Sequence, residues 1–254
     1  MRNIIAVHTG TGNSLYLASK LKGYEIHFID EYLSGKESLP EDLESLGIIY
    51  PVYCFGLPYP VRMFVDKVLS SRDNSALEYL FAVNTSGGFP GSANRQLEIL
   101  LSSCNLALAY SNGVRMPDAY LPLKKKASTE AQTHALLEKS KKKIEIIAND
   151  VLSRQIRLPG KGITPKMMMR ISGKANMPHK ENSLSCSDRC TGCGVCHKIC
   201  PAGNIEIVGN RPVFGDSCIS CYACYHRCPE NALLFKGAKG QYKGLQATNE
   251  MFRR

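Results

Sequence analysis

Cysteines are the residues with the most evident chemistry in this sequence, because nine of the 11 lie between Cys186 and Cys228. Eight of them form two copies of one spacing, CxxCxxCxxxCP, which starts at Cys190 and again at Cys218. Three thiolates at every third position of a tight loop can wrap one face of a cubic iron–sulfur cluster, and a fourth cysteine must close the remaining corner. Zinc usually takes two CxxC pairs separated by a longer loop, so the repeat favours two [4Fe–4S] clusters over zinc or disulfides.

Other residues near the motifs leave alternatives open. Cys186 is a spare ligand or a packed residue on a short strand, and the second interpretation is favoured. His197 and His226 lie inside the motifs and are either donors to cluster sulfurs or exposed surface residues. Cys54 is a reactive thiol or, as favoured, a packed one, and Cys104 belongs to the core.

A second motif, Thr9-Gly10-Thr11-Gly12-Asn13-Ser14, follows the apolar run Asn3–Val7. Backbone N–H groups and hydroxyls in such a loop can hold a phosphate without a lysine. The loop lacks the third glycine of a dinucleotide fingerprint and the Gly-Lys-Ser/Thr of a Walker loop. It therefore predicts a site for a phosphate monoester at the end of the first strand.

Strands that alternate with helices must position this loop. Short apolar runs predict strands at 3–7, 24–29, 46–52, 79–83 and 106–110. Apolar residues at helical spacing predict helices that begin near Leu15, Pro60 and Ser92. A long helix is predicted over 128–153, with Thr129 and Gln132 at capping-box spacing near its start. The alternation predicts an α/β fold with a parallel sheet and ligands at the carboxyl ends of its strands.

The cysteine segment resembles the two-cluster bacterial-type ferredoxins over about 50 residues, with both motifs complete. In that family the fourth cysteine of each motif binds the other cluster. The resemblance therefore implies one cluster on Cys190, Cys193, Cys196 and Cys228, and another on Cys218, Cys221, Cys224 and Cys200.

The loop at residues 9–14 resembles the FMN-phosphate loop of flavodoxins, Ser/Thr-x-Thr-Gly-x-Thr/Ser, at every defined position. The resemblance implies a five-stranded parallel sheet of order 2-1-3-4-5, bound FMN, and two further loops that hold its ring. Which of Tyr53, Phe55 and Phe89 stacks on the ring stays open. The short segment 30–46 departs from the family and predicts a second helix that is brief or poorly formed. The implied cofactor-binding residues are Thr9, Gly10, Thr11, Gly12, Asn13, Ser14, Pro51, Val52, Tyr53, Phe55, Gly56, Asn84, Thr85, Ser86, Gly87 and Gly88.

The chain divides into a flavodoxin-like domain (1–153), a basic linker (154–181), a small α+β 2[4Fe–4S] ferredoxin-type domain (182–236) and a polar tail (237–254). This arrangement resembles the flavodoxin–ferredoxin fusion proteins of anaerobes, the EFR1-family ferredoxins. Each domain is expected to bury its own cofactor.

The expected function is electron transfer between the clusters, FMN and a redox partner, since the sequence offers no catalytic triad and no nicotinamide motif. The alternative is an FMN-dependent oxidoreductase that reduces a small molecule with electrons fed through the clusters. No apolar run spans a membrane, and a cytoplasmic protein is expected.

The net charge of +10 lies entirely in residues 154–254, which hold 16 Lys/Arg against 6 Asp/Glu. Two clusters and a phosphate would offset more than half of this excess, and no nucleic-acid motif is present, so nucleic acid is not an expected partner. Seven Lys/Arg without an acid lie in 154–180, which is either a solvated tether or a docking arm for an acidic, ferredoxin-like partner. The oligomeric state is not predicted.

Overall fold

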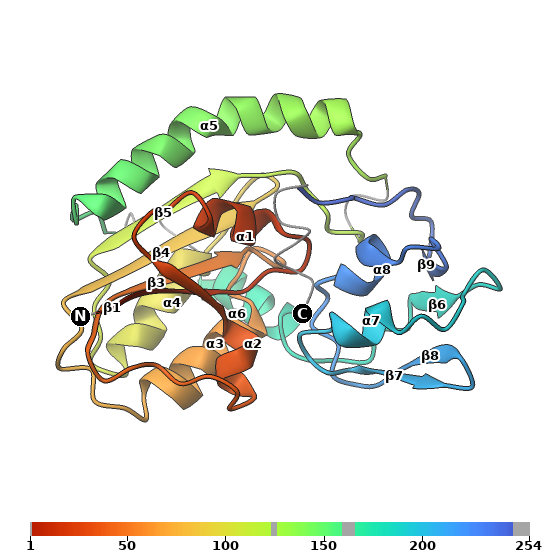
Figure 1. Cartoon of the computed structure of the whole chain (residues 1–254), viewed down its shortest axis with the longest axis horizontal. Coiled ribbons are helices and arrows are strands. Elements are labelled where there is room, and N and C mark those ends of the chain that lie inside the picture. Colours follow the sequence, from red (N-terminus) through yellow and green to blue (C-terminus); the bar gives the residue numbers. More distant parts are fainter. Residues whose placement is uncertain (1, 123–125, 159–165, 246–254) are drawn as a thin grey trace.

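The computed structural model describes residues 2–122, 126–158 and 166–245. Figure 1 shows a larger part built around a central sheet and, beside it, a smaller part that holds both cysteine motifs. The larger part contains β1 (Arg2–Val7), α1 (Asn13–Ala18), β2 (Glu25–Phe28), α2 (Ile29–Leu33), β3 (Leu43–Pro51), α3 (Tyr59–Phe64), the π-helical turn η1 (Val65–Leu69), β4 (Tyr79–Ser86), α4 (Ala93–Ser102), β5 (Tyr110–Arg115), α5 (Glu130–Leu152) and α6 (Lys166–Ala175). The smaller part contains β6 (Leu184–Cys186), α7 (Val195–Lys198), β7 (Ile205–Val208), β8 (Arg211–Phe214), α8 (Ala223–Arg227) and β9 (Leu233–Phe235).

The five strands of the larger part are all parallel and lie in the order β2-β1-β3-β4-β5. This order confirms the flavodoxin-like fold class. The strand order reverses between β1 and β3, so the carboxyl ends of these strands border the crevice in which such sheets bind ligands. The loops after β1, β3 and β4 meet at this edge.

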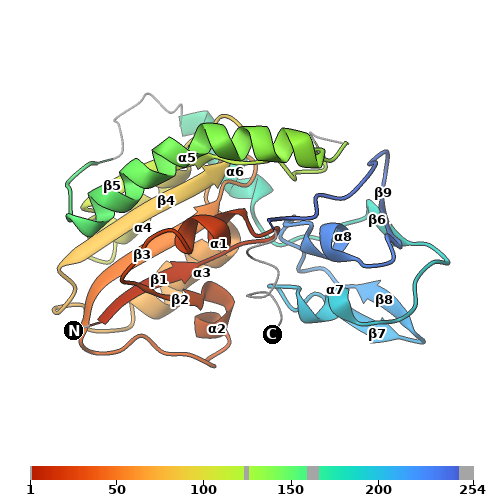
Figure 2. The same ribbon diagram turned by 45° about the horizontal axis from the view of Figure 1, so that its top comes forward.

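Alternating side chains divide the core into two layers. Ile4 and Ala6 of β1 pack with α2, α3 and α4 on one face of the sheet, whereas Ile5 and Val7 pack with α1 and α5 on the other. Figure 2 shows α5 lying along the sheet on the face that α1 also covers. Gly47 of β3 faces Phe81 of β4, and a Cβ there would lie 2.2 Å from the Phe81 ring, so only glycine fits.

The fifth strand lies later in the chain than predicted, at Tyr110–Arg115 instead of 106–110. Its middle is Ser111-Asn112-Gly113, a polar sequence that is typical of turns. The side chain of Asn94 in α4 donates to Ser111 Oγ at 2.7 Å and to the Asn112 carbonyl at 3.0 Å. Because a helix supplies these hydrogen bonds, polar residues can occupy a buried strand.

Predictions based on local chemistry agree with the structure. Thr129 accepts from the Gln132 N–H at 3.2 Å, and Gln132 accepts in return from the Thr129 N–H at 3.1 Å, which completes the capping box of α5. The second helix, α2, has only five residues, as the short segment 30–46 predicts. Ser92 immediately precedes α4 as its N-cap, although its side chain makes no capping hydrogen bond.

The segment expected to be a linker is held against the larger part where it is described. Arg154 forms ion pairs with Glu44 and Glu78, and the Arg157 carbonyl accepts from the Ser111 N–H at 2.7 Å. Further along, α6 contacts α4, because Gln96 Nε2 donates to Ser172 Oγ at 2.6 Å. Lys161 of the expected docking arm lies outside the described residues.

The expected tail is likewise packed as far as residue 245. Tyr242 and Leu245 are 2% and 6% exposed, and Leu245 belongs to the core layer beneath α5. Two apolar side chains in an otherwise polar segment are thus buried against the rest of the chain, which an average over composition conceals. Within the described ranges, no helix combines the length and the apolar character needed to cross a bilayer.

The smaller part consists of two antiparallel strand pairs around two short helices. β6 pairs with β9, β7 pairs with β8, and α7 and α8 lie in contact between them. Tyr222, Tyr225 and Leu233 form its apolar core, and several motif cysteines pack against them. The core is small, as expected for a domain of this length.

Candidate metal and cofactor site

Four motif cysteines line a first cavity in the smaller part. Three come from the segment around the start of α7 and the fourth from the end of α8: Cys190, Cys193, Cys196 and Cys228. The surrounding side chains include the apolar Ile207, Pro212 and Leu233. The Ala232 N–H donates to the Cys228 sulfur at 3.3 Å. Cys193 is exposed, so this cavity lies near the molecular surface.

The other four motif cysteines, Cys200, Cys218, Cys221 and Cys224, line a second cavity. Burial raises the pKa of the Cys221 thiol to about 12 and that of Cys224 well above its ordinary value. Burial therefore disfavours the free thiolate at both of these cysteines. Backbone N–H groups of Asn204 and Ser220 donate to the sulfurs of Cys200 and Cys218 at 3.3 and 3.4 Å. The two groups of four are those that the resemblance to ferredoxins implies.

At two of the positions where their side chains differ, the two motifs share a left-handed backbone conformation. Gly192 and Gly194 have φ angles of 71° and 73°, and the equivalent residues 28 positions later, Ser220 and Tyr222, have 54° and 53°. A serine and a tyrosine in this left-handed region each cost about 1 kcal/mol or more. The second motif therefore carries side chains where glycine would be less strained. Both residues border the larger part's crevice, while their hydroxyls bond to His179 and Glu181.

The phosphate loop is a compact turn between β1 and α1. Gly12 has a φ of 98°, and its N–H donates to Thr9 Oγ1 at 3.0 Å. Ser14 Oγ lies 2.9 Å from Thr85 Oγ1, which connects the loop to the end of β4. Asn13 Nδ2 donates to the Pro117 carbonyl at 2.8 Å and ties the loop to the segment after β5.

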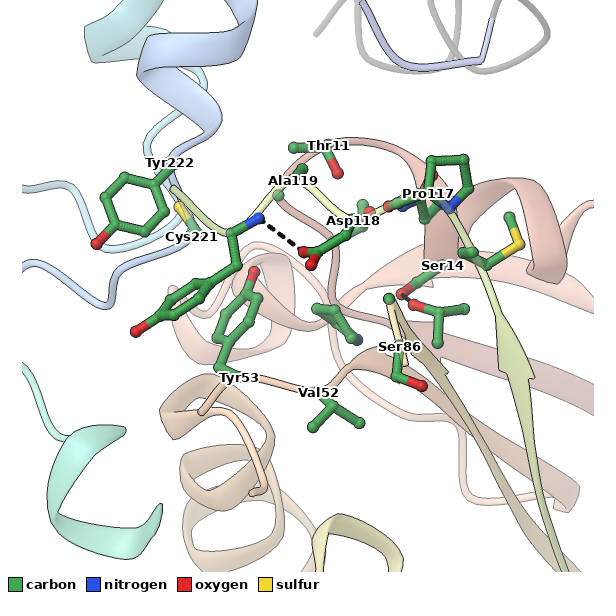
Figure 3. Close-up of a pocket in the computed structure, with 18 of the residues that line it drawn as sticks. Thr11, Ser14, Val52, Tyr53, Ser86, Pro117, Asp118, Ala119, Cys221 and Tyr222 are labelled. Atoms are coloured by element: carbon green, nitrogen blue, oxygen red, sulfur yellow. Dashed lines mark hydrogen bonds between the residues drawn. The ribbon is translucent and has the colours of Figure 1, made fainter. Parts of the chain in front are cut away.

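A pocket opens at this edge of the sheet (Figure 3). The residues expected to bind a cofactor that line it are Thr9, Gly10, Thr11, Asn13, Ser14, Pro51, Val52, Tyr53, Thr85, Ser86 and Gly87. The expected residues that do not line it are Gly12, Phe55, Gly56, Asn84 and Gly88. Three loops distant in sequence are thus brought together, as the flavodoxin-like fold requires.

Of the three candidate stacking aromatics, only Tyr53 lines the pocket. Phe55 and Phe89 are 41% and 64% exposed, and their ring centroids are 6.2 Å apart at the surface. Asn84 also lies elsewhere: its side chain is buried in the sheet, where Nδ2 donates to Asn94 Oδ1 at 2.8 Å.

Two segments of the pocket wall were not identified from the sequence. One is Met116–Tyr120, directly after β5, and the other is Ser220–Tyr222 in the second cysteine motif. The sequence predicts that the fifth strand ends at residue 110, so it places the loop at the carboxyl end of this strand too early in the chain. Pro117-Asp118 is a turn signal in the correct place, and Asp118 accepts from the Tyr120 N–H at 3.0 Å.

The expectation that each domain encloses its own cofactor is wrong in one respect, because the two sites share a wall. A Cβ added to Gly10 would lie 2.8 Å from the Cys221 carbonyl oxygen, 3.1 Å from Cys221 Cβ and 3.1 Å from Tyr53 Oη. Only a glycine lets the phosphate loop approach the cysteine motif this closely. Cys221 itself lines both the second cysteine cavity and the pocket.

His226 and Tyr242 hold the same contact from the side of the smaller part. His226 Nε2 donates to the Ala119 carbonyl at 2.8 Å, and its Nδ1 accepts from the Tyr242 N–H at 3.0 Å. Burial lowers the pKa of His226 to about 4, so the ring is neutral and this hydrogen-bond pattern fixes its tautomer. Tyr242 Oη donates to Asn13 Oδ1 at 2.8 Å. His226 is therefore neither exposed nor bonded to a cysteine. His197 is exposed, as one of the two interpretations predicts, and its Nδ1 contacts the Ile205 carbonyl.

The residues present fit the expected cofactors. Each cysteine cavity offers four thiols and a largely apolar lining, as an iron–sulfur cluster requires. The pocket offers the hydroxyls of Thr9, Thr11 and Ser14, and it contains the Tyr53 hydroxyl, which is buried and has no partner among the described residues. A buried hydroxyl of this kind indicates that a bound group supplies its polar partner.

Comparisons with known proteins agree with this geometry. Residues 189–233 match the family model of the 4Fe-4S dicluster domain. These residues form a 4Fe-4S dicluster domain, and the chain joins it to a flavodoxin-like sheet, as expected of a flavodoxin–ferredoxin fusion. No curated protein matches the chain.

Similar solved structures are distant. They include a putative flavoprotein from Bacteroides uniformis (12% identity, 45% of this chain and 90% of that one, TM-score 0.36). Rubredoxin oxygen:oxidoreductase from Desulfovibrio gigas is 11% identical, with a TM-score of 0.36, and the match covers 60% of this chain and 36% of that one. Trp repressor binding protein from Bacillus subtilis is 16% identical, with a TM-score of 0.40, and the match covers 61% of this chain and 100% of that one. The flavodoxin-like fold follows from the strand order β2-β1-β3-β4-β5 of this chain.

Proposed function

We propose that this protein transfers electrons through two [4Fe–4S] clusters and one FMN. One cluster is held by Cys190, Cys193, Cys196 and Cys228, and the other by Cys218, Cys221, Cys224 and Cys200. FMN is held in the pocket by the loop at residues 9–14, by the segments after β3 and β4 and by Met116–Tyr120. An iron–sulfur cluster exchanges single electrons and FMN exchanges one or two, so the combination collects single electrons into pairs.

One observation carries this proposal: Cys221 and Tyr222 line the second cysteine cavity and the pocket at once. A residue that ligates a cluster and also borders a flavin leaves no room for intervening protein or bulk water. The hydrogen bonds of His226 and Tyr242 to the larger part fix this separation. Rigid, short contact between two redox groups is what an electron-transfer protein has to supply.

The arrangement of the cavities gives the proposed path an order. Cys193 of the first cavity is exposed, whereas Cys224 of the second is buried. The first cavity is therefore the one that faces a partner at the surface. The second lies between it and the pocket, since α7 and α8 are in contact and α8 adjoins the larger part.

The test is anaerobic reconstitution of the full chain, with iron, sulfide and FMN counted in the same sample. We expect eight irons and one FMN per chain, and bleaching of FMN when dithionite reduces the clusters. Cys218→Ala should lose one cluster and slow the bleaching at least tenfold, whereas Cys104→Ala, a residue packed against the core, should do neither. Absence of FMN, or equal bleaching in both variants, would contradict the proposal. Turnover of a small oxidant without a protein acceptor would instead favour an FMN-dependent oxidoreductase.

A further inference from the structure

Tyr53 occupies the point where the phosphate loop, the pocket and the second cysteine motif meet. Its Oη and the Cys221 Cβ both lie 3.1 Å from the position that a Gly10 Cβ would take. Figure 3 shows its ring rising from the segment after β3 into the pocket, on the side where Cys221 approaches.

The backbone and ring of Tyr53 are held firmly. Tyr53 and Gly56 exchange backbone hydrogen bonds across a tight turn, and Asn176 Nδ2 donates to the Tyr53 carbonyl at 2.7 Å. The ring packs edge-on against His8, with centroids 5.8 Å apart. Burial lowers the pKa of His8 to about 4, so this neighbour is neutral and does not attract the hydroxyl as a charge would.

The hydroxyl of Tyr53 differs from those of the other tyrosines at the pocket. Tyr222 Oη donates to Glu181 at 3.1 Å, and Tyr120 interacts with Cys54. Tyr53 Oη is buried and finds no hydrogen-bond partner among the residues that the structure describes. Leaving a buried hydroxyl unbonded is unfavourable, so its partner belongs to a bound group.

We propose that the Tyr53 hydroxyl donates a hydrogen bond to the sulfurs of the cluster that Cys221 holds, and thereby raises the reduction potential of that cluster. This inference rests on the proposed function, because it requires that cluster to be bound. Reduction adds one electron and hence one negative charge to the cluster, so a donor aimed at its sulfurs stabilises the reduced form more. A tyrosine hydroxyl, whose ordinary pKa is about 10, keeps its proton at neutral pH and can act as the donor.

The test is a potentiometric titration of the reconstituted full chain, followed by electron paramagnetic resonance. The signal that disappears in Cys218→Ala identifies the cluster concerned. In Tyr53→Phe its equilibrium constant for reduction should fall about tenfold, which is about 59 mV for one electron, and the other cluster should not change. Tyr53→His, which keeps an aromatic ring with an N–H donor, should restore part of the shift.

Tyr50→Phe is the matched control, since it removes another buried tyrosine hydroxyl three residues earlier, one that donates to Asn94 at 2.6 Å. It should leave both potentials unchanged. Equal potentials in Tyr53→Phe and the unmodified protein would overturn the inference, as would a change in FMN affinity alone, which would assign the hydroxyl to the flavin. Failure of Tyr53→Phe to assemble clusters would also overturn it, because the hydroxyl would then serve assembly. If the unmodified chain binds no cluster, the proposed function itself fails.

Discussion

Single residues decide how closely the two cofactor sites approach, and Gly10 is the clearest case. The Cβ of an alanine there would lie 2.8 Å from the Cys221 carbonyl oxygen, a backbone atom that has little freedom to move. Overpacking of this kind costs about 1–3 kcal/mol. We expect Gly10→Ala to weaken FMN binding about tenfold or more, measured by fluorescence titration of the cluster-loaded protein.

Gly88 is the control for that substitution. It lies in the loop after β4, and a Cβ added there meets nothing within 4 Å. Gly88→Ala should therefore bind FMN as the unmodified protein does. Similar affinities for both alanine variants would show that the phosphate loop does not press against the cysteine motif.

The residues that carry chemistry were the easiest to predict from the sequence. Cysteine spacing is a local pattern, and thiols at positions 190 and 218 start the same turn and short helix because the chain repeats itself. The hydroxyls of Thr9 and Ser14 could also be predicted, because they too belong to a local sequence motif. Tyr53 could not be singled out from Phe55, because the choice depends on a tight turn that points one ring inward and the other outward.

Elements defined by apolar periodicity were also predictable, whereas polar elements were not. β1 and β3 are continuous apolar runs, but β5 is buried through hydrogen bonds from Asn94, which no periodicity reveals. Because the sequence predicts β5 too early in the chain, it does not predict that Met116–Tyr120 forms a wall of the pocket. Apolar periodicity did not predict the helix α6 either, because polar side chains attach it to the larger part: Ser172 and the neighbouring Asn176.

At the scale of the two cysteine helices, the pattern of ligands remains a prediction that variants can test. Pro201 and Pro229 favour an extended conformation for the cysteine before each of them, and Cys228 has a ψ of 116° at the end of α8. Each fourth cysteine thus leaves its own helix and lines the opposite cavity. We expect Cys200→Ala and Cys218→Ala to lose the same cluster, and Cys190→Ala to lose the other.

Electron paramagnetic resonance of the three reduced variants distinguishes the possibilities. The surviving signal should be identical in Cys200→Ala and Cys218→Ala and different in Cys190→Ala. An identical survivor in Cys200→Ala and Cys190→Ala would mean that each motif binds its own cluster.

At the scale of the whole molecule, the contact between the two parts couples the cofactor sites. Tyr242 follows the cysteine motifs, yet its hydroxyl donates to Asn13 in the phosphate loop. Removing that hydroxyl leaves Asn13 Oδ1 buried without this donor, at a cost of about 1 kcal/mol. Tyr242→Phe should therefore weaken FMN binding about fivefold while both clusters persist.

Tyr24→Phe controls for the loss of a tyrosine hydroxyl elsewhere, since Tyr24 Oη contacts only Ser45 at 2.9 Å among the hydrogen bonds of the described residues. It should leave the FMN affinity unchanged. Equal affinities for Tyr242→Phe and the unmodified protein would indicate that the two parts bind their cofactors independently.

The distribution of charge leads to a last prediction, about a redox partner. Arg62, Arg170 and Lys174 line a groove between α3, α4 and α6, next to the exposed Ile99 and Met177. Arg154, from the same basic segment, is already paired with Glu44 and Glu78. If the segment docks an acidic partner, Arg170 and Lys174 contribute to the attraction and Arg154 does not.

Association that is steered by charge slows steeply as salt rises, because the screening length is only about 10 Å at 0.1 M. We expect reduction of this protein by an acidic ferredoxin to slow on the order of tenfold between low and high salt. The double variant Arg170→Gln, Lys174→Gln should be slow already at low salt, whereas Arg154→Gln should behave as the unmodified protein. A rate that is independent of salt, or equal in all three proteins, would mean that the basic segment only connects the two parts. Stopped-flow absorbance at several ionic strengths separates these outcomes.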